Sequence, residues 1–156
     1  GGRAFHIVAV GRSTAYCESL KRRIAELGLA DYCHFHHNVP FADLPSFYRL
    51  ACLFVYPSRI EGFGIPLLEA LTSGVPAVGC TGSCLEEAGG QGSIYVDPDD
   101  AEGMRKAVES VLGDETLRQR MIADGREHIK RFTDETLCAD LMHVYEKTMS
   151  QPSATR

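Results

Sequence analysis

The residue pattern over 53–71 is typical of a short apolar strand, a glycine-rich loop and the start of a helix in succession, and this order restricts the possible folds more than any other segment. Residues 53–56 combine aromatic and β-branched side chains, as buried strands do. Gly62 and Gly64 allow backbone torsions that are closed to other residues and let a ligand approach the main chain. Pro66 suits the first position of a helix. The segment therefore predicts a strand, an accessible loop and a helix.

Two glutamates flank this loop and the helix start. The first amides of a helix lack internal partners and lie at the positive end of its dipole, so Gly64 and Ile65 can donate to an anionic or hydroxyl-rich ligand. Glu61 precedes the helix and Glu69 lies one turn into it, so both carboxylates bracket these amides. A carboxylate matches the adjacent hydroxyls of a ribose or a pyranose. The segment indicates a sugar-nucleotide site, and the alternative for Glu69 is a helix-dipole partner that contributes about 0.3–1 kcal/mol.

The stretch resembles the E-x7-E signature of retaining GT-B glycosyltransferases, especially glycosyltransferase family 4, whose usual form is PS..EGFG.P.LEA...G.P. The matching residues are Pro57, Ser58, Glu61, Gly62, Phe63, Gly64, Pro66, Leu68, Glu69, Ala70, Gly74 and Pro76. Residues 7–11 resemble the family's strand ending in glycine, 43–48 its dl..ly helix, and 96–100 its vdP.d turn. The resemblance covers residues 5–147.

The resemblance implies a catalytic role for Glu61, which corresponds to the glutamate that binds and orients the donor sugar. Glu69 corresponds to the residue that grips the ribose hydroxyls. Asn38 and Val39 correspond to the loop beside the base. Main-chain contacts to the sugar and the phosphate are implied for four consecutive residues: Gly62, Phe63, Gly64 and Ile65.

The implied activity is that of a retaining hexosyltransferase in polysaccharide biosynthesis. Its donor is a nucleoside diphosphate sugar such as GDP-mannose or UDP-glucose, and its acceptor is a glycan or a lipid-linked molecule. In this family the acceptor attacks the donor sugar from its front face, and the protein supplies no nucleophile. The resemblance implies neither a metal nor another cofactor. The family's acceptor-binding N-terminal domain and its phosphate-gripping arginine and lysine precede the segment where this chain starts, so the chain alone is expected to be inactive. His37 replaces a usual glycine.

Strand-like and helix-like segments alternate along the chain, as in a parallel sheet covered by helices. We expect a Rossmann-like α/β fold, the C-terminal half of a GT-B glycosyltransferase with C-terminal helices. It forms one domain over residues 1–150, truncated at its N-terminus, with a polar tail over 151–156. Ligands of such sheets bind beyond the carboxyl ends of the strands. Four segments that follow strands are therefore expected to share one rim: Gly11, the 36–39 loop, the Glu61 loop and the 81–83 turn.

The same patterns predict the ends of individual elements. The expected strands are residues 5–10, 32–37, 53–56, 76–80 and 93–96. Gly28 is expected to stop the first helix. Asp99 with Glu102, Asp114 and Thr133 are expected to cap three later helices.

Composition excludes several classes of protein. A net charge of −5 over 156 residues gives no reason to expect nucleic-acid binding. No apolar run is long enough to span a bilayer and no signal peptide is evident, so a cytoplasmic protein is expected. Basic helix faces, such as residues 21–23, leave peripheral contact with the inner face of the membrane open. Six cysteines are too few for a disulfide scaffold and are expected to be reduced thiols.

Three other functions compete with the transferase. A glycoside hydrolase also uses two carboxylates, but a glycine loop at a helix start suits phosphate, which a simple glycoside lacks. A dinucleotide-dependent dehydrogenase is disfavoured because Gly11 is not followed by the G-x-G-x-x-G pattern. A non-catalytic nucleotide-binding or interaction module of the same fold remains the main alternative.

Metal sites are disfavoured at three places. Asp97 and Asp99 fit a DxD pattern, but Asp99 is explained as a helix cap. Residues 33–37 contain one cysteine and three histidines, but successive strand residues face opposite ways, so His34 and His36 share one face and Cys33 and His37 the other. Cys80 and Cys84 lack a second cysteine pair to complete a zinc site.

Overall fold

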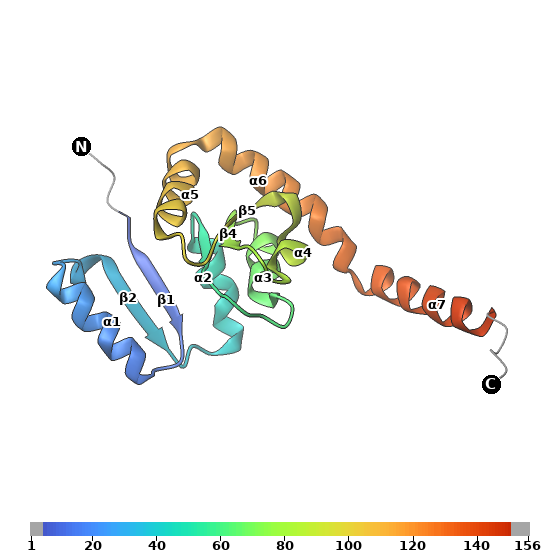
Figure 1. The fold of residues 1–156 in the computed structure, drawn as a ribbon, viewed down its shortest axis with the longest axis horizontal. Coiled ribbons are helices and arrows are strands. Elements are labelled where there is room, and N and C mark those ends of the chain that lie inside the picture. Colours follow the sequence, from blue (N-terminus) through green and yellow to red (C-terminus); the bar gives the residue numbers. More distant parts are fainter. Residues whose placement is uncertain (1–4, 151–156) are drawn as a thin grey trace. The chain divides into compact units, whose positions relative to one another are not determined.

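The computed structural model of the chain describes residues 5–150, and Figure 1 shows its fold. The chain forms two compact units, Gly1–Leu44 and Pro45–Arg156. The single domain expected over residues 1–150 stays a prediction, and the polar tail assigned to 151–156 lies outside the described residues. None of the helices within residues 5–150 is both long and apolar enough to cross a bilayer.

The first unit is a β–α–β crossover. Strand β1 (Ile7–Gly11) leads into helix α1 (Ala15–Glu26), and the chain returns in strand β2 (Cys33–His37), which pairs with β1 in parallel. Gly28, the expected stop of the first helix, adopts a left-handed φ of 68° just after α1 ends. Two short 3₁₀ helices complete the unit: η1 (Ala30–Tyr32) and η2 (Phe41–Asp43).

The second unit continues the alternation of helices and strands. After α2, which begins at the junction of the units, its elements include three parallel strands in the spatial order β3–β4–β5. The elements in chain order are α2 (Leu44–Leu50), β3 (Phe54–Tyr56), α3 (Ile65–Thr72), β4 (Ala77–Cys80), α4 (Leu85–Gly89), η3 (Gly90–Gly92), β5 (Ser93–Val96), α5 (Ala101–Gly113), α6 (Glu115–His128), η4 (Ile129–Phe132) and α7 (Asp134–Ser150).

The core of the second unit lies on both faces of the central strand β4, all four residues of which are buried. Because successive strand residues face opposite ways, Ala77 and Val78 belong to different clusters. Ala77 packs with Leu67 and Leu71 of α3 and with Ala88 of α4. On the other face, Val78 packs with three residues of α5 and α6: Ala107, Val111 and Met121. The sheet is thus covered by helices on both sides, which confirms the expected Rossmann-like α/β class.

The strands match the expected ranges to within two residues, but they form two sheets rather than one. Among the described strands, β1 pairs only with β2, and β3 pairs only with β4. Gly11 and the 36–39 loop therefore follow strands of one sheet, whereas the Glu61 loop and the 81–83 turn follow strands of the other. The expectation that these four segments share the rim of a single sheet is not met.

Helix caps were predicted with mixed success. Asp114 accepts a hydrogen bond from Leu117 N at 3.0 Å and caps α6, as expected. The expected cap at Asp99 is wrong, because Asp100 caps α5 by accepting from Gly103 N at 2.8 Å. The Asp99 carboxylate is instead held by Arg59, a partner forty residues away that no local pattern reveals.

Candidate functional site

The glycine loop ends at the first turn of α3. Gly64 occupies the N-cap position with φ 101°, and its carbonyl accepts from Leu67 N at 2.9 Å. None of the hydrogen bonds found among residues 5–150 uses the N–H of Phe63 or Gly64 as a donor. Pro66 is the second residue of α3, one place later than expected. The loop therefore presents unpaired backbone amides at a helix N-terminus, which suits an anionic ligand.

Gly64 is also required by packing. A Cβ atom at this position would lie 2.7 Å from Leu85 Cδ2 and 3.3 Å from Ala88 Cβ, both on α4. Gly64 is buried, whereas Gly62 is exposed, and a Cβ atom added to Gly62 would lie more than 4 Å from every atom beyond its two neighbours in the chain. The two glycines of the signature thus have different roles. The absence of a side chain at Gly64 lets α4 pack against the loop, whereas Gly62 leaves open space beside it.

Glu61 is half-buried at the start of the loop and accepts a hydrogen bond from the Tyr56 hydroxyl at 2.7 Å. This hydroxyl, and then that of Ser58, hold the pKa of Glu61 below its usual range, so the carboxylate is ionised. Burial, followed by the bond to Glu61, raises the pKa of Tyr56 to about 12 and keeps it a donor. Cys84 Sγ donates to the backbone carbonyl of Glu61 at 3.2 Å and ties the loop to the start of α4.

Glu69 is held in the same manner from a different element. Its carboxylate is half-buried on α3 and accepts from the hydroxyl of Tyr48, on α2, at 2.9 Å. Burial, and then the bond to Glu69, raise the pKa of Tyr48, which stays protonated. Both carboxylates flanking the loop are thus partly accessible, and each has one tyrosine donor.

Aromatic rings connect the two tyrosines. Phe54 lies between them, with its centroid 5.4 Å from that of Tyr48 in an edge-on arrangement and 5.6 Å from that of Tyr56 in a stacked one. Phe54 and Tyr56 share one face of β3 because they are two residues apart. Tyr48 and Tyr56 were not predicted as site residues. The period-two aromatic pattern of residues 54–56 places rings on one face of the strand but does not reveal which carboxylates they meet.

The remaining predicted residues fall outside this cluster. Asn38 and Val39 directly follow β2 in the first unit, and Asn38 adopts a left-handed φ of 56°. Their contact with a base stays a prediction. Arg59, a basic side chain just before the glycine loop, pairs with Asp99 at 2.5 Å. Along β2, burial alternates as expected: His34 and His36 are exposed, and the intervening residues are half-buried.

Metal-binding side chains do not cluster within the described part of the chain. Among residues 5–150, no group of three or more histidine, cysteine or acidic residues is placed to hold a metal ion. The Asp97 carboxylate accepts from Asp99 N at 2.8 Å, so the DxD pattern forms a local turn. The six cysteines are free.

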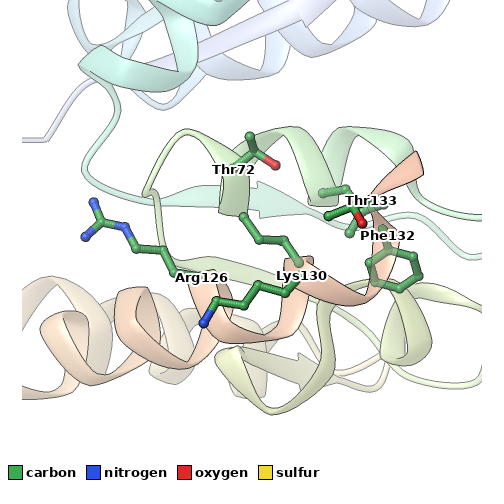
Figure 2. Close-up of a pocket in the computed structure, with 7 residues that line it drawn as sticks. Thr72, Arg126, Lys130, Phe132 and Thr133 are labelled. Carbon is green, nitrogen blue, oxygen red and sulfur yellow. The ribbon is translucent and has the colours of Figure 1, made fainter. Parts of the chain in front are cut away.

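A pocket of about 360 Å³ is lined by residues of α3, α6 and η4, and neither glutamate is among its lining residues (Figure 2). Its lining residues are Leu68, Thr72, Arg126, Ile129, Lys130, Phe132 and Thr133. In Figure 2 the charged ends of Arg126 and Lys130 lie at one end and Phe132 and Thr133 at the other. The ring of Phe132 also meets that of Phe63 edge-on at 5.5 Å, so η4 supports the glycine loop from this side.

Comparison with known proteins found relatives in sequence and chains of similar fold. O-antigen chain mannosyltransferase B of Escherichia coli is 36% identical over 108 residues, which are 69% of this chain and 28% of that protein. The crystal structure of Anabaena HepE in complex with UDP-glucose is 19% identical with a TM-score of 0.79, over 91% of this chain and 41% of HepE. The C-terminal domain of a Francisella tularensis group 1 glycosyl transferase, LpcC, is 20% identical with a TM-score of 0.70, over 80% of this chain and 68% of that domain's chain.

These likenesses differ in what they show. The two structural comparisons establish the fold, which is the one expected for this half of a GT-B glycosyltransferase. The chain spans only 28% of the length of the E. coli mannosyltransferase. Residues 2–128, most of the chain, match the family described as glycosyl transferases group 1. The chain therefore belongs to the group 1 glycosyltransferases.

Proposed function

We propose that this chain is the donor-binding part of a retaining hexosyltransferase that builds a polysaccharide. The observation that carries the proposal is the pair of half-buried carboxylates, Glu61 and Glu69, on either side of a helix start with unpaired amides at Phe63 and Gly64. Membership of the group 1 family and likeness to a mannosyltransferase of O-antigen synthesis support it.

The reaction needs two kinds of charge stabilisation. The bond between the anomeric carbon and the phosphate oxygen breaks, and its electron pair leaves with the nucleoside diphosphate. The acceptor hydroxyl oxygen forms the new bond on the same face, and its proton passes to the departing phosphate. Amides at the start of α3 stabilise the negative charge on the phosphate, and the ionised carboxylate of Glu61 stabilises the positive character at the anomeric carbon.

The donor of this reaction is a nucleoside diphosphate hexose, GDP-mannose or UDP-glucose. The relative from E. coli is named a mannosyltransferase, and the HepE structure holds UDP-glucose. Glu69 accepts from the two ribose hydroxyls through the carboxylate oxygen that Tyr48 leaves free. The acceptor is a glycan or a lipid-linked molecule bound outside this chain. The proposal includes no metal and no further cofactor, and assigns the reaction to the cytoplasm.

A thermal-shift panel on the full-length protein tests this function. UDP, GDP and ADP, each with and without its hexose, are added to the wild type and to Glu69→Gln. One diphosphate is expected to raise the melting temperature, since a ligand at one hundred times its Kd stabilises a protein by about 2.7 kcal/mol. Glu69→Gln should reduce this shift, while Glu109→Gln, which alters an exposed carboxylate paired with Arg105, should not. A protein that no nucleotide stabilises would contradict the proposal.

A further inference from the structure

The two tyrosines beside the glutamates are placed to do more than fill the core. Tyr56 donates to Oε1 of Glu61 at 2.7 Å, and Tyr48 donates to Oε2 of Glu69 at 2.9 Å. Each phenol therefore occupies one oxygen of its carboxylate. The nearby hydroxyl of Ser58 donates to the Ile60 carbonyl at 3.3 Å. The Ser58 hydroxyl also helps to lower the pKa of Glu61. No hydrogen bond found among residues 5–150 engages the second oxygen of either carboxylate, so that oxygen can accept from a ligand hydroxyl.

Packing fixes both phenol rings. Phe54 is stacked on Tyr56 and meets Tyr48 edge-on. Phe54 and Tyr56 also rest on the core cluster that contains Leu67 and Leu71 of α3, the helix that carries Glu69. A single aromatic stack from α2 and β3 thus sets the direction of two carboxylates that lie eight residues apart.

We propose that Tyr56 and Tyr48 are positioning residues of the site: Tyr56 aims Glu61 at the sugar, and Tyr48 aims Glu69 at the ribose. This inference rests on the proposed function and deepens it. It assigns the two hydroxyls to different steps. Loss of the Tyr56 hydroxyl affects the transfer step, in which Glu61 acts, whereas loss of the Tyr48 hydroxyl affects the binding of the donor.

Protonation supplies a second signature for Tyr56. Its hydrogen bond stabilises the ionised carboxylate and is the largest cause of the lowered pKa of Glu61. Without the hydroxyl, the pKa of Glu61 rises, so a larger fraction of the carboxyl is protonated at mildly acidic pH. The acid limb of the turnover profile therefore moves to higher pH in Tyr56→Phe. A tyrosine that only fills space would leave this limb unchanged.

The test compares Tyr56→Phe, Tyr48→Phe and Tyr95→Phe in the full-length protein. Tyr95 is the matched control because it is a partly buried tyrosine whose hydroxyl donates to a backbone carbonyl, that of Gly90, at 3.0 Å. Release of nucleoside diphosphate from GDP-mannose and from UDP-glucose is measured against pH, with membranes of the native host as the source of acceptor. Thermal unfolding of all three variants is recorded alongside.

Tyr56→Phe is expected to lower kcat by roughly 10-fold and to move the acid limb upward, because a hydrogen bond to a charged group is lost. Tyr48→Phe should raise KM for the donor by roughly 10-fold with kcat little changed. Tyr95→Phe should change neither. If Tyr56→Phe unfolds, a protein with 3-fluorotyrosine at position 56 is tested in its place. Its hydroxyl is a stronger hydrogen-bond donor, so the acid limb of the turnover profile should move to lower pH.

The parallel variants Glu61→Gln and Glu69→Gln distinguish failure of the proposed function from failure of the positioning role. Wild-type turnover and donor binding in both of these would overturn the proposed function itself. Loss of turnover in Glu61→Gln, with Tyr56→Phe and Tyr48→Phe matching Tyr95→Phe in kcat, KM and pH profile, would leave the function standing and overturn the positioning role.

Discussion

Replacing Glu61 with glutamine is expected to lower donor turnover by at least about 100-fold, the usual loss when one electrostatic stabiliser of a transition state is removed. The amide keeps the size of the side chain and can still accept from Tyr56, but it carries no charge to offset the positive character at the anomeric carbon. Folding stability should stay within about 0.5 kcal/mol of the wild type, because Glu61 is only half-buried and forms no ion pair within residues 5–150.

Release of nucleoside diphosphate from GDP-mannose and UDP-glucose by the full-length protein measures this effect. Glu109→Gln makes the same chemical change at an exposed position on α5, where the surface ion pair with Arg105 contributes little to stability. Its turnover should equal that of the wild type. If the turnover of Glu61→Gln were within two-fold of that of Glu109→Gln, Glu61 would have no role in the catalytic step.

Replacing Gly64 with alanine is expected to cost about 2–5 kcal/mol of folding stability. The residue has φ 101°, and a left-handed backbone costs a residue with a Cβ about 1–2 kcal/mol. The added carbon would lie 2.7 Å from Leu85 Cδ2 and 3.3 Å from Ala88 Cβ, and overpacking of this kind costs about 1–3 kcal/mol. Urea unfolding of the full-length protein should show a lower midpoint with an unchanged slope.

Gly62→Ala is the control for this loss of stability. A Cβ at Gly62 would lie more than 4 Å from every atom beyond its two neighbours in the chain, and Gly62 is not among the glycines with positive φ. Its unfolding midpoint should lie close to that of the wild type. Equal losses at both positions would show that the contact between the loop and α4 does not hold Gly64 in place.

Local chemistry predicted much of this fold because the deciding interactions are short in range. The all-buried strand β4 could be predicted from an apolar run, and Asp114 as a cap from its place before a helical pattern. The two glutamates followed from their spacing around a glycine loop and a helix start. Each of these features depends on neighbours within one or two turns of the chain.

Features that depend on distant partners could not be predicted in this way. Asp99 resembles a helix cap in the sequence, but its carboxylate accepts a hydrogen bond from Arg59, forty residues away. The cap of α5 is Asp100 instead. Tyr48 meets Glu69 across twenty-one residues. The division of the strands into two sheets likewise depends on pairing that no single segment encodes.

The most direct test of the account is a crystal structure of the full-length protein with GDP-mannose or UDP-glucose bound. The account predicts Glu61 within about 3 Å of a hexose hydroxyl and Glu69 within about 3 Å of the ribose hydroxyls, with the amides of residues 63–65 on the diphosphate. A donor bound in the crystal with neither carboxylate in contact with it would contradict the account.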